Sequence, residues 1–403
     1  MKSERILRSL GEVSEAYIAD AAPLAGSRTK RGWLRWGAMA ACLACVVLVG
    51  VGIARHAQPT ETLPMLTIGD TMQGSMGFEG YMAFNFGELS GAATLDGAEK
   101  LKTLPVYRNT LTYDNYGRVS DADPTAMREW LLEVAGRLGM DTESLTVTDN
   151  APDAAEREAI LAKFAKVGST PPEGYFDATA VILEDAQYKV EVSTDMTATI
   201  CFKQPVTLPE GYKFGHHVPY DSMLRVAEYF CQTYAALIGM DDPQINLTGG
   251  DYDIYRRQGY QIEFYEGKGG LTEQLVSRYL QTVLFYPDDE GRLRLARIYR
   301  TDLSEKVGDY PIISAEEAKA LLLNGNYITT VPEVMPGEVY IAGVELGYRA
   351  GARDAYAMPY YRFYVELPGM EQEDGLKTYG AYYVPAVEGR YLTDMPVWDG
   401  SFN

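Results

Sequence analysis

The chain has 403 residues, 46% of them hydrophobic, and its 56 acidic and 36 basic residues give a formal net charge of −20. This length is enough for more than one hydrophobic core, and the acidic excess excludes nucleic acid as a partner held mainly through phosphate contacts. The three histidines have no Cys or His partners at metal-ligand spacing, and no catalytic or phosphate-binding motif occurs. The sequence therefore predicts no cofactor and no metal ion, and the protein is not expected to be an enzyme.

Residues 3–22 have the pattern of an amphipathic helix. One face of that helix carries an apolar stripe, formed by Ile6, Leu10, Val13 and Tyr17. A lone helix cannot cover this face by itself, so it either docks on a partner protein or remains a frayed helix beside the membrane. With the basic linker that follows, residues 1–32 form a predicted cytoplasmic segment.

Residues 33–56 predict a single transmembrane helix. The uncharged stretch from Trp36 to Ala54 extends about 28 Å as a helix, close to the roughly 30 Å hydrocarbon core of a bilayer. A cleaved signal peptide is disfavoured, because a long segment with four acidic residues precedes the apolar run and a poor cleavage site follows it. A buried core helix would need an equally apolar partner surface. Cys42 and Cys45 are interpreted as small apolar residues of this helix.

The flanking charges predict the orientation in the membrane. Four basic residues lie between Arg28 and Arg35, whereas after Arg55 no Lys or Arg follows until Lys100. The positive-inside rule then places the N-terminus in the cytoplasm and the C-terminal bulk outside. The expected location is the cell membrane, with a single pass and an acidic extracellular part.

After a linker at residues 57–76, the chain predicts three units of one helix and several strands, at residues 77–208, 209–308 and 309–403. Asp123 before a proline begins the first helix, and Asp221 or Ser222 begins the second. Ser314 and Glu317 form a capping box for the third. An additional helix is expected at Ala154–Lys166. Strands are expected at residues 78–86, 104–108, 178–183, 188–193, 197–203, 245–247, 253–255, 261–265, 279–286, 293–300, 339–346, 360–367 and 379–385.

The expected fold class is therefore α+β: a single N-terminal transmembrane helix followed by about three helix-on-antiparallel-sheet modules. Within these modules, Cys201 and Cys231 either form a disulfide or remain two separate buried thiols, and the second interpretation is slightly favoured. Tyr360, Tyr364 and Tyr382 either pack within the sheet or, if exposed together, form a binding face.

Four stretches within residues 309–394 carry a resemblance to a known family: PIISAEEAKALLLNG, VELGYRAG, MPYYRFYVEL and YYVPAVEGRYL. They resemble the extracellular modules of YycI/YycH-type regulators, single-pass proteins of Gram-positive bacteria that restrain a cell-wall-sensing histidine kinase. Those modules are similar to the PepSY and cystatin-like helix-on-sheet fold. The N-terminal layout, with W-x-x-W-G-A-x-A-A-C-L after the basic linker, resembles uncharacterised clostridial bitopic proteins, some of them membrane anti-sigma factors. These resemblances imply a sigma factor or a membrane histidine kinase as the cytoplasmic partner.

The sequence thus predicts a membrane-spanning regulatory or sensor protein, whose outer part binds a partner or ligand while the inner helix docks a regulatory protein. The alternative is an envelope-anchored, non-catalytic binding or scaffold protein with an inert cytoplasmic tail. An envelope hydrolase would need a cluster of acidic side chains facing a cleft, and the sequence alone does not place one.

Overall fold

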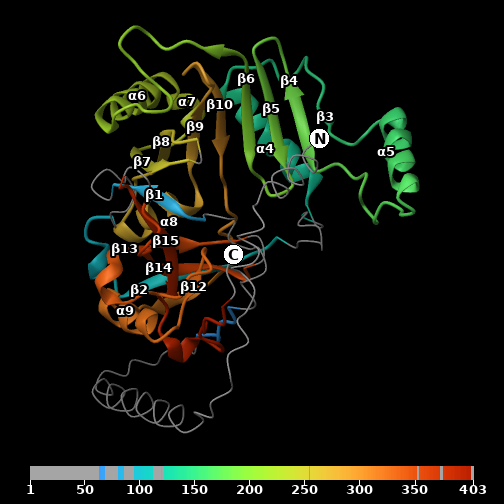
Figure 1. Cartoon of the computed structure of the whole chain (residues 1–403). Coiled ribbons are helices and arrows are strands. Elements are labelled where there is room, and N and C mark those ends of the chain that lie inside the picture. The colour runs from blue at the N-terminus through green and yellow to red at the C-terminus, as the bar shows by residue number, and fades with distance from the viewer. Residues whose placement is uncertain are drawn as a thin grey trace. The chain divides into compact units, whose positions relative to one another are not determined.

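The computed structural model describes residues 63–68, 80–85, 95–111, 119, 122–253, 255–351, 354–372 and 375–400. All of these residues belong to one unit, Leu63–Asn403. Six α-helices and fifteen β-strands lie in this described part of the chain (Figure 1).

The α-helices are α4 (Pro124–Arg137), α5 (Ala154–Lys166), α6 (Tyr220–Thr233), α7 (Ala235–Ile238), α8 (Leu271–Leu280) and α9 (Ala315–Leu323). The strands are β1 (Met82–Phe84), β2 (Thr103–Arg108), β3 (Thr148–Asp149), β4 (Ala180–Glu184), β5 (Tyr188–Ser193), β6 (Ala198–Val206), β7 (Pro243–Tyr252), β8 (Gln258–Glu266), β9 (Val283–Pro287), β10 (Leu293–Ile298), β11 (Lys306–Pro311), β12 (Ile328–Thr329), β13 (Ile341–Arg349), β14 (Tyr356–Glu366) and β15 (Lys377–Pro385).

The expected fold class, a transmembrane helix followed by separate helix-on-sheet modules, is wrong. The fifteen strands form one antiparallel sheet, whose main path runs β11-β2-β14-β15-β1-β7-β8-β9-β10-β6-β5-β4-β3. Strands β12 and β13 pair with β15 and β14 outside this path. The described residues also contain no helix that is both long and apolar enough to cross a membrane. The segment for which a transmembrane helix was predicted, residues 33–56, lies outside the described residues.

Pairing between distant segments is the reason that separate modules do not form. Strand β2, assigned by the sequence to the first module, pairs with β11, which crosses the predicted boundary between the second and third modules, and with β14 of the third. Strand β1 pairs with β15 on one side and, through Ala83 opposite Tyr252, with β7 on the other. Each such pairing covers an edge whose backbone N–H and C=O groups would otherwise lack partners. The predicted units therefore merge into a continuous ladder.

Local capping signals predicted several helices correctly. Asp123 accepts a hydrogen bond of 2.8 Å from the Thr125 backbone N–H at the start of α4. Ser314 and Glu317 form the expected capping box of α9, and α5 has the predicted bounds. The expected cap of the second helix is wrong, because α6 begins after Pro219 and has no side-chain cap.

Helix α8 was missed, since the sequence predicted one strand over residues 279–286. The chain instead forms α8, then turns and enters β9. Leu271, Leu275 and Leu280 follow at steps of four and five, and the last two are buried. This helical spacing was the overlooked signal. Helix α8 contacts both β8 and β13, which are not neighbouring strands in the sheet.

The central strands β14 and β15 are buried on both faces, so they carry core residues at successive positions. One face packs with α8 and α9, and the other is covered by Leu66, Phe84 and Leu392. A third cluster lies between β4–β10 and helices α4, α6 and α7. Helix α5, by contrast, has no buried residue and stands away from the sheet (Figure 1).

Candidate functional site

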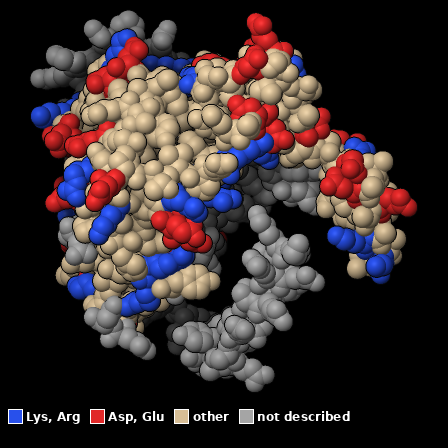
Figure 2. All heavy atoms as spheres, turned by 90° about the horizontal axis from the view of Figure 1, so that it is seen from above, with Lys and Arg blue, Asp and Glu red and all other residues tan. Residues whose placement is uncertain are grey.

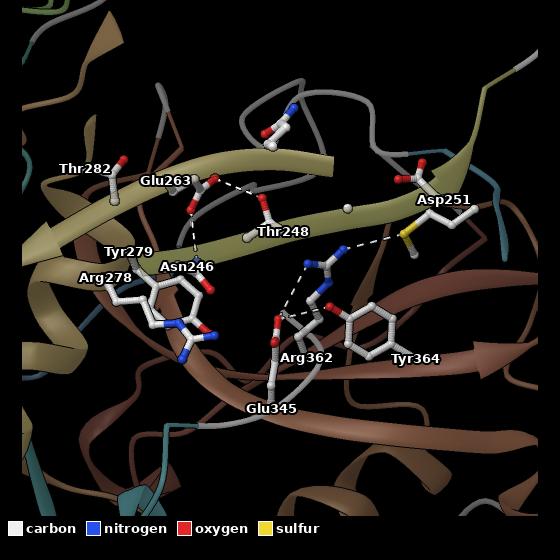
Figure 3. A pocket seen from close by; sticks show the side chains of 13 residues that line it. Asn246, Thr248, Asp251, Glu263, Arg278, Tyr279, Thr282, Glu345, Arg362 and Tyr364 are labelled. Atoms are coloured by element: carbon white, nitrogen blue, oxygen red, sulfur yellow. Dashed lines mark hydrogen bonds and ion pairs between the residues drawn. The ribbon is translucent and has the colours of Figure 1, made fainter. Parts of the chain in front are cut away.

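The main cavity of the described residues has a volume of about 490 Å³ and lies between the β7–β8 pair and the β13–β14 pair. Figure 3 shows side chains of the two pairs facing one another across it. The cavity is lined by residues of β1, β7, β8, β13, β14 and of α8 and the turn that follows it: Met82, Asn246, Thr248, Gly249, Asp251, Gln261, Glu263, Arg278, Tyr279, Thr282, Glu345, Arg362 and Tyr364.

The register of β7 against β8 builds one wall of the cavity. Asn246 lies opposite Glu263, and Thr248 lies opposite Gln261, so these side chains share one face of the ladder. Asn246 Nδ2 donates to Glu263 Oε2 at 3.0 Å, and Thr248 Oγ1 donates to Glu263 Oε1 at 3.1 Å. Both oxygens of the Glu263 carboxyl are therefore held by neutral donors.

A bulge in β7 brings a second carboxyl to the same wall. The register shifts by one residue between Gly249, opposite Tyr260, and Tyr252, opposite Gln258. The extra residue reverses the alternation of side chains, and Asp251 thereby joins Thr248 in lining the cavity. Gly249 has a φ of +85°, and a Cβ there would come within 2.7 Å of the Gly259 carbonyl oxygen. The bulge therefore requires glycine at this position.

The opposite wall carries an ion pair between neighbouring strands. Glu345 of β13 lies directly opposite Arg362 of β14, and Arg362 Nη1 is 3.5 Å from Glu345 Oε1. Tyr364 Oη donates to the same oxygen at 3.2 Å. The Arg362 guanidinium also lies over the Tyr364 ring, 4.6 Å from its centroid. This arrangement compensates the charge of a Glu345 side chain that is only 3% exposed.

Helix α8 completes the cavity with Arg278 and Tyr279. The Tyr279 ring packs against the backbone of Gly347 in β13, where an added Cβ would overlap it. The small residue at position 347 thus allows the helix to approach the strand closely. Thr282, in the turn after α8, is buried and adds a hydroxyl to the lining.

The cavity makes ionisation of its acidic groups costly. Burial raises the pKa of Glu263, and the hydrogen bonds from Thr248 and Asn246 and the charge of Arg278 oppose this only in part. Burial also raises the pKa of Asp251, against the opposing charge of Arg362. For Tyr279, burial raises the pKa of the phenol. Carboxyls whose pKa values are raised by burial in a cavity are typical of functional sites.

The residues that the sequence singled out have different places in the structure. Tyr360, Tyr364 and Tyr382 do not form an exposed face, because none is more than 4% exposed. They lie on strands covered from both sides, although Tyr364 does line the cavity. Cys201 on β6 and Cys231 on α6 are both free thiols. The apolar stripe of residues 6–17 lies outside the described residues.

The other residues of the cavity were not predicted from the sequence. Glu263 and Glu345 are 82 positions apart in the chain, and no local pattern relates them. One signal was available, since Gly249-Gly250 within an otherwise strand-like stretch indicates a bulge. The sequence analysis instead placed two short strands on either side of these glycines.

A second cavity of about 190 Å³ lies where β2 and β10 end. Its charged side chains have partners within the protein: Arg108 lies 3.5 Å from Glu305, and Asp302 accepts a hydrogen bond from Thr110 at 3.1 Å. The described residues also include no group of three or more His, Cys, Asp or Glu side chains placed to hold a metal ion. On the molecular face in Figure 2, acidic and basic side chains are interspersed around a broad uncharged area.

Comparison of the whole chain with protein-family models and with curated proteins found no match. The resemblances to YycI/YycH-type regulators and to membrane anti-sigma factors therefore stay predictions.

Proposed function

We propose that this chain is a non-catalytic regulatory protein of the cell membrane, whose part beyond residue 62 binds a small polar ligand. The observation that carries the proposal is the cavity of about 490 Å³, whose size falls in the range of small-molecule sites. Its wall contains five charged side chains, supplied by two strand pairs and one helix. Such convergent polar groups, held on regular secondary structure, are suited to orienting a ligand.

The lining residues favour binding over covalent chemistry. Among them there is no serine, cysteine or histidine that would serve as a nucleophile with an adjacent base. Glu345 is engaged by Arg362 and Tyr364, which fixes its position. Burial raises the pKa values of Glu263 and Asp251, so both carboxyls could exchange a proton, and proton exchange alone also serves recognition.

The regulatory part of the proposal rests on the N-terminal sequence. Residues 33–56 would hold the protein in the membrane, with the N-terminus in the cytoplasm and the cavity outside. Ile6, Leu10, Val13 and Tyr17 would then contact a cytoplasmic partner, a sigma factor or a membrane histidine kinase. Binding of a ligand in the cavity would change the affinity of the N-terminal segment for that partner. Such coupling requires that the ligand bind two states of the protein with different affinities.

Blocking the cavity tests the ligand-binding part. The full chain is heated with a panel of amines, amino acids, dicarboxylates and sugars, and compounds that raise its melting temperature are retained. Gln261 is an exposed residue of the lining, so Gln261→Trp places an indole at the cavity without disturbing the core. We expect the shift to be lost in Gln261→Trp and kept in Gln187→Trp, a control at an exposed turn. Absence of any shift in the unaltered protein would refute the proposal.

Deleting residues 2–25 tests the regulatory part separately. If these residues dock a partner, co-purification of a sigma factor or a histidine kinase with the full chain should be lost in the deletion variant. The double substitution Leu10→Asp and Val13→Asp should have the same effect, because it interrupts the stripe without shortening the chain. An unchanged set of co-purifying proteins would indicate an inert tail, as expected of a scaffold protein.

A further inference from the structure

The cavity has an excess of negative charge among its lining residues. Three carboxyl groups line it, those of Asp251, Glu263 and Glu345, together with two guanidinium groups, those of Arg278 and Arg362. Glu345 and Arg362 form a pair of their own, 3.5 Å apart. The charge of Arg362 also acts on Asp251 and that of Arg278 on Glu263, so the lining as a whole has one carboxyl more than it has guanidinium groups.

We infer that the cavity binds a small organic cation with two primary ammonium groups, one received by the Glu263 side chain and the other by the Asp251 side chain of the β7–β8 wall. This inference rests on the proposed function and specifies its ligand. An ammonium group offers three donors, and the wall presents carboxylate oxygens of Asp251 and Glu263 beside the side-chain oxygens of Asn246 and Thr248.

The alternative, an anionic ligand, fits the geometry less well. Arg362 is tied to Glu345 and packs on the Tyr364 ring, so a ligand carboxylate would compete with a contact already present. Arg278 acts on Glu263 through its charge, and an anion bound to Arg278 would remove that compensation. A cation adds a favourable interaction with Glu263 and leaves the Arg362–Glu345 ion pair intact.

The pH dependence of affinity distinguishes a cationic ligand from an anionic one. A bound ammonium group favours the ionised carboxylates, so it lowers the raised pKa values of Glu263 and Asp251 and releases protons. Affinity for a cation should therefore increase as the pH rises, whereas affinity for an anion should decrease. The charged and titratable groups that face Glu263 are Asp251 from β7, Arg278 and Tyr279 from α8, Tyr286 from β9, Glu345 from β13, and Arg362 and Tyr364 from β14.

The test compares two probes of similar length and opposite charge, 1,4-diaminobutane and glutarate. Calorimetric titration of the full chain should show at least tenfold tighter binding of the diamine, and its affinity should rise between pH 5.5 and pH 7.5. Glu263→Gln should weaken diamine binding about tenfold or more. Glu210→Gln, which removes one exposed charge elsewhere, should leave it unchanged. Asp251→Asn provides a second variant with the same expectation, in case Glu263→Gln does not fold.

The outcomes separate this inference from the function on which it rests. If glutarate binds and 1,4-diaminobutane does not, the cavity is a ligand site but the ligand class is wrong. If the diamine binds with equal affinity to wild type, Glu263→Gln and Asp251→Asn, binding occurs elsewhere and the inference fails. If neither probe binds and no compound of the wider panel raises the melting temperature, both the inference and the proposed function are refuted.

Discussion

Glu263 accepts hydrogen bonds from Asn246 and Thr248 within the cavity, while burial raises the pKa of its carboxyl. The folded protein therefore retains the Glu263 proton to a higher pH than the unfolded chain does. As the pH rises above the unfolded value of about 4.3, the unfolded chain ionises first and the free energy of unfolding decreases. This loss continues until the pH passes the raised pKa of the folded state. A functional residue can thus be retained at the expense of stability.

Glu263→Gln should increase the free energy of unfolding at pH 7, because glutamine never ionises; its carbonyl oxygen can accept from Asn246 and its amide N–H can donate to the Thr248 hydroxyl. The gain should diminish as the pH falls towards about 4, where glutamate is protonated in both states. Urea unfolding at a series of pH values measures this difference, with Glu210→Gln as the control for loss of one charge. Destabilisation that grows as the pH rises would show that the ionised carboxylate stabilises the fold, and it would contradict the raised pKa of Glu263.

For single helices, the sequence correctly predicted the features that neighbouring residues determine. The starts of α4 and α9 and the extent of α5 follow from capping residues and helical spacing within a dozen neighbouring positions. Helix α8 was missed because its apolar residues lead directly into those of β9, so the two read as one strand. The cavity was not predictable in this way, because Glu345 meets Arg362 through strand pairing and approaches the β7–β8 wall only after the sheet is assembled.

Gly347 allows α8 to pack against β13, and this close contact can be tested by adding one methyl group. Gly347→Ala should lower the free energy of unfolding by about 1–3 kcal/mol, because the new Cβ displaces the Tyr279 ring. Gly136→Ala is a control in α4 with open space around the added carbon, and it should stabilise by about 0.5–1 kcal/mol. Urea unfolding of both variants is the measurement. Equal effects of the two substitutions would contradict the packing of Tyr279 on Gly347.

The capping box of α9 provides a second test at this scale. Ser314 Oγ accepts from the Glu317 backbone N–H at 3.3 Å, and the Glu317 carboxylate accepts from the Ser314 N–H at 2.8 Å. Ser314→Ala should therefore cost about 1 kcal/mol of unfolding free energy.

The matched control for the capping box is Ser222→Ala in α6. Ser222 is not a cap in the structure, and its hydroxyl accepts only from Arg225 at 3.0 Å, so the change should cost less than about 0.5 kcal/mol. A loss as large as that of Ser314→Ala would mean that Ser222 caps α6, as the sequence suggested.

For the molecule as a whole, the predicted modules are not independent, because their strands complete one another. The third predicted module contains β14 and β15, and these strands pair with β2 and β1 from residues 82–108. The sequence indicated where strands lie, but hydrophobic alternation carries no information on which distant strand becomes the neighbour. Burial of β14 and β15 on both faces likewise depends on segments from the start and the end of the unit.

Residues 309–403 expressed alone should therefore fail to fold. Without β1, β2 and the covering residues Leu66 and Phe84, one face of β14 and β15 would be exposed to water. An amide NMR spectrum of this fragment should show poor dispersion, whereas residues 63–403 should give well-dispersed signals. A well-dispersed spectrum of the fragment would restore the idea of an independent module.

Binding of a cation at Glu263 and Asp251, in the cavity between β7–β8 and β13–β14, should change the protonation of these carboxyls. The most direct measurement is the number of protons exchanged when 1,4-diaminobutane binds the full chain, obtained by calorimetry at about pH 5.5 in two buffers with different heats of ionisation. The account predicts net proton release by the wild-type protein and a smaller release by Glu263→Gln. Proton uptake, or binding with no proton exchange, would contradict it.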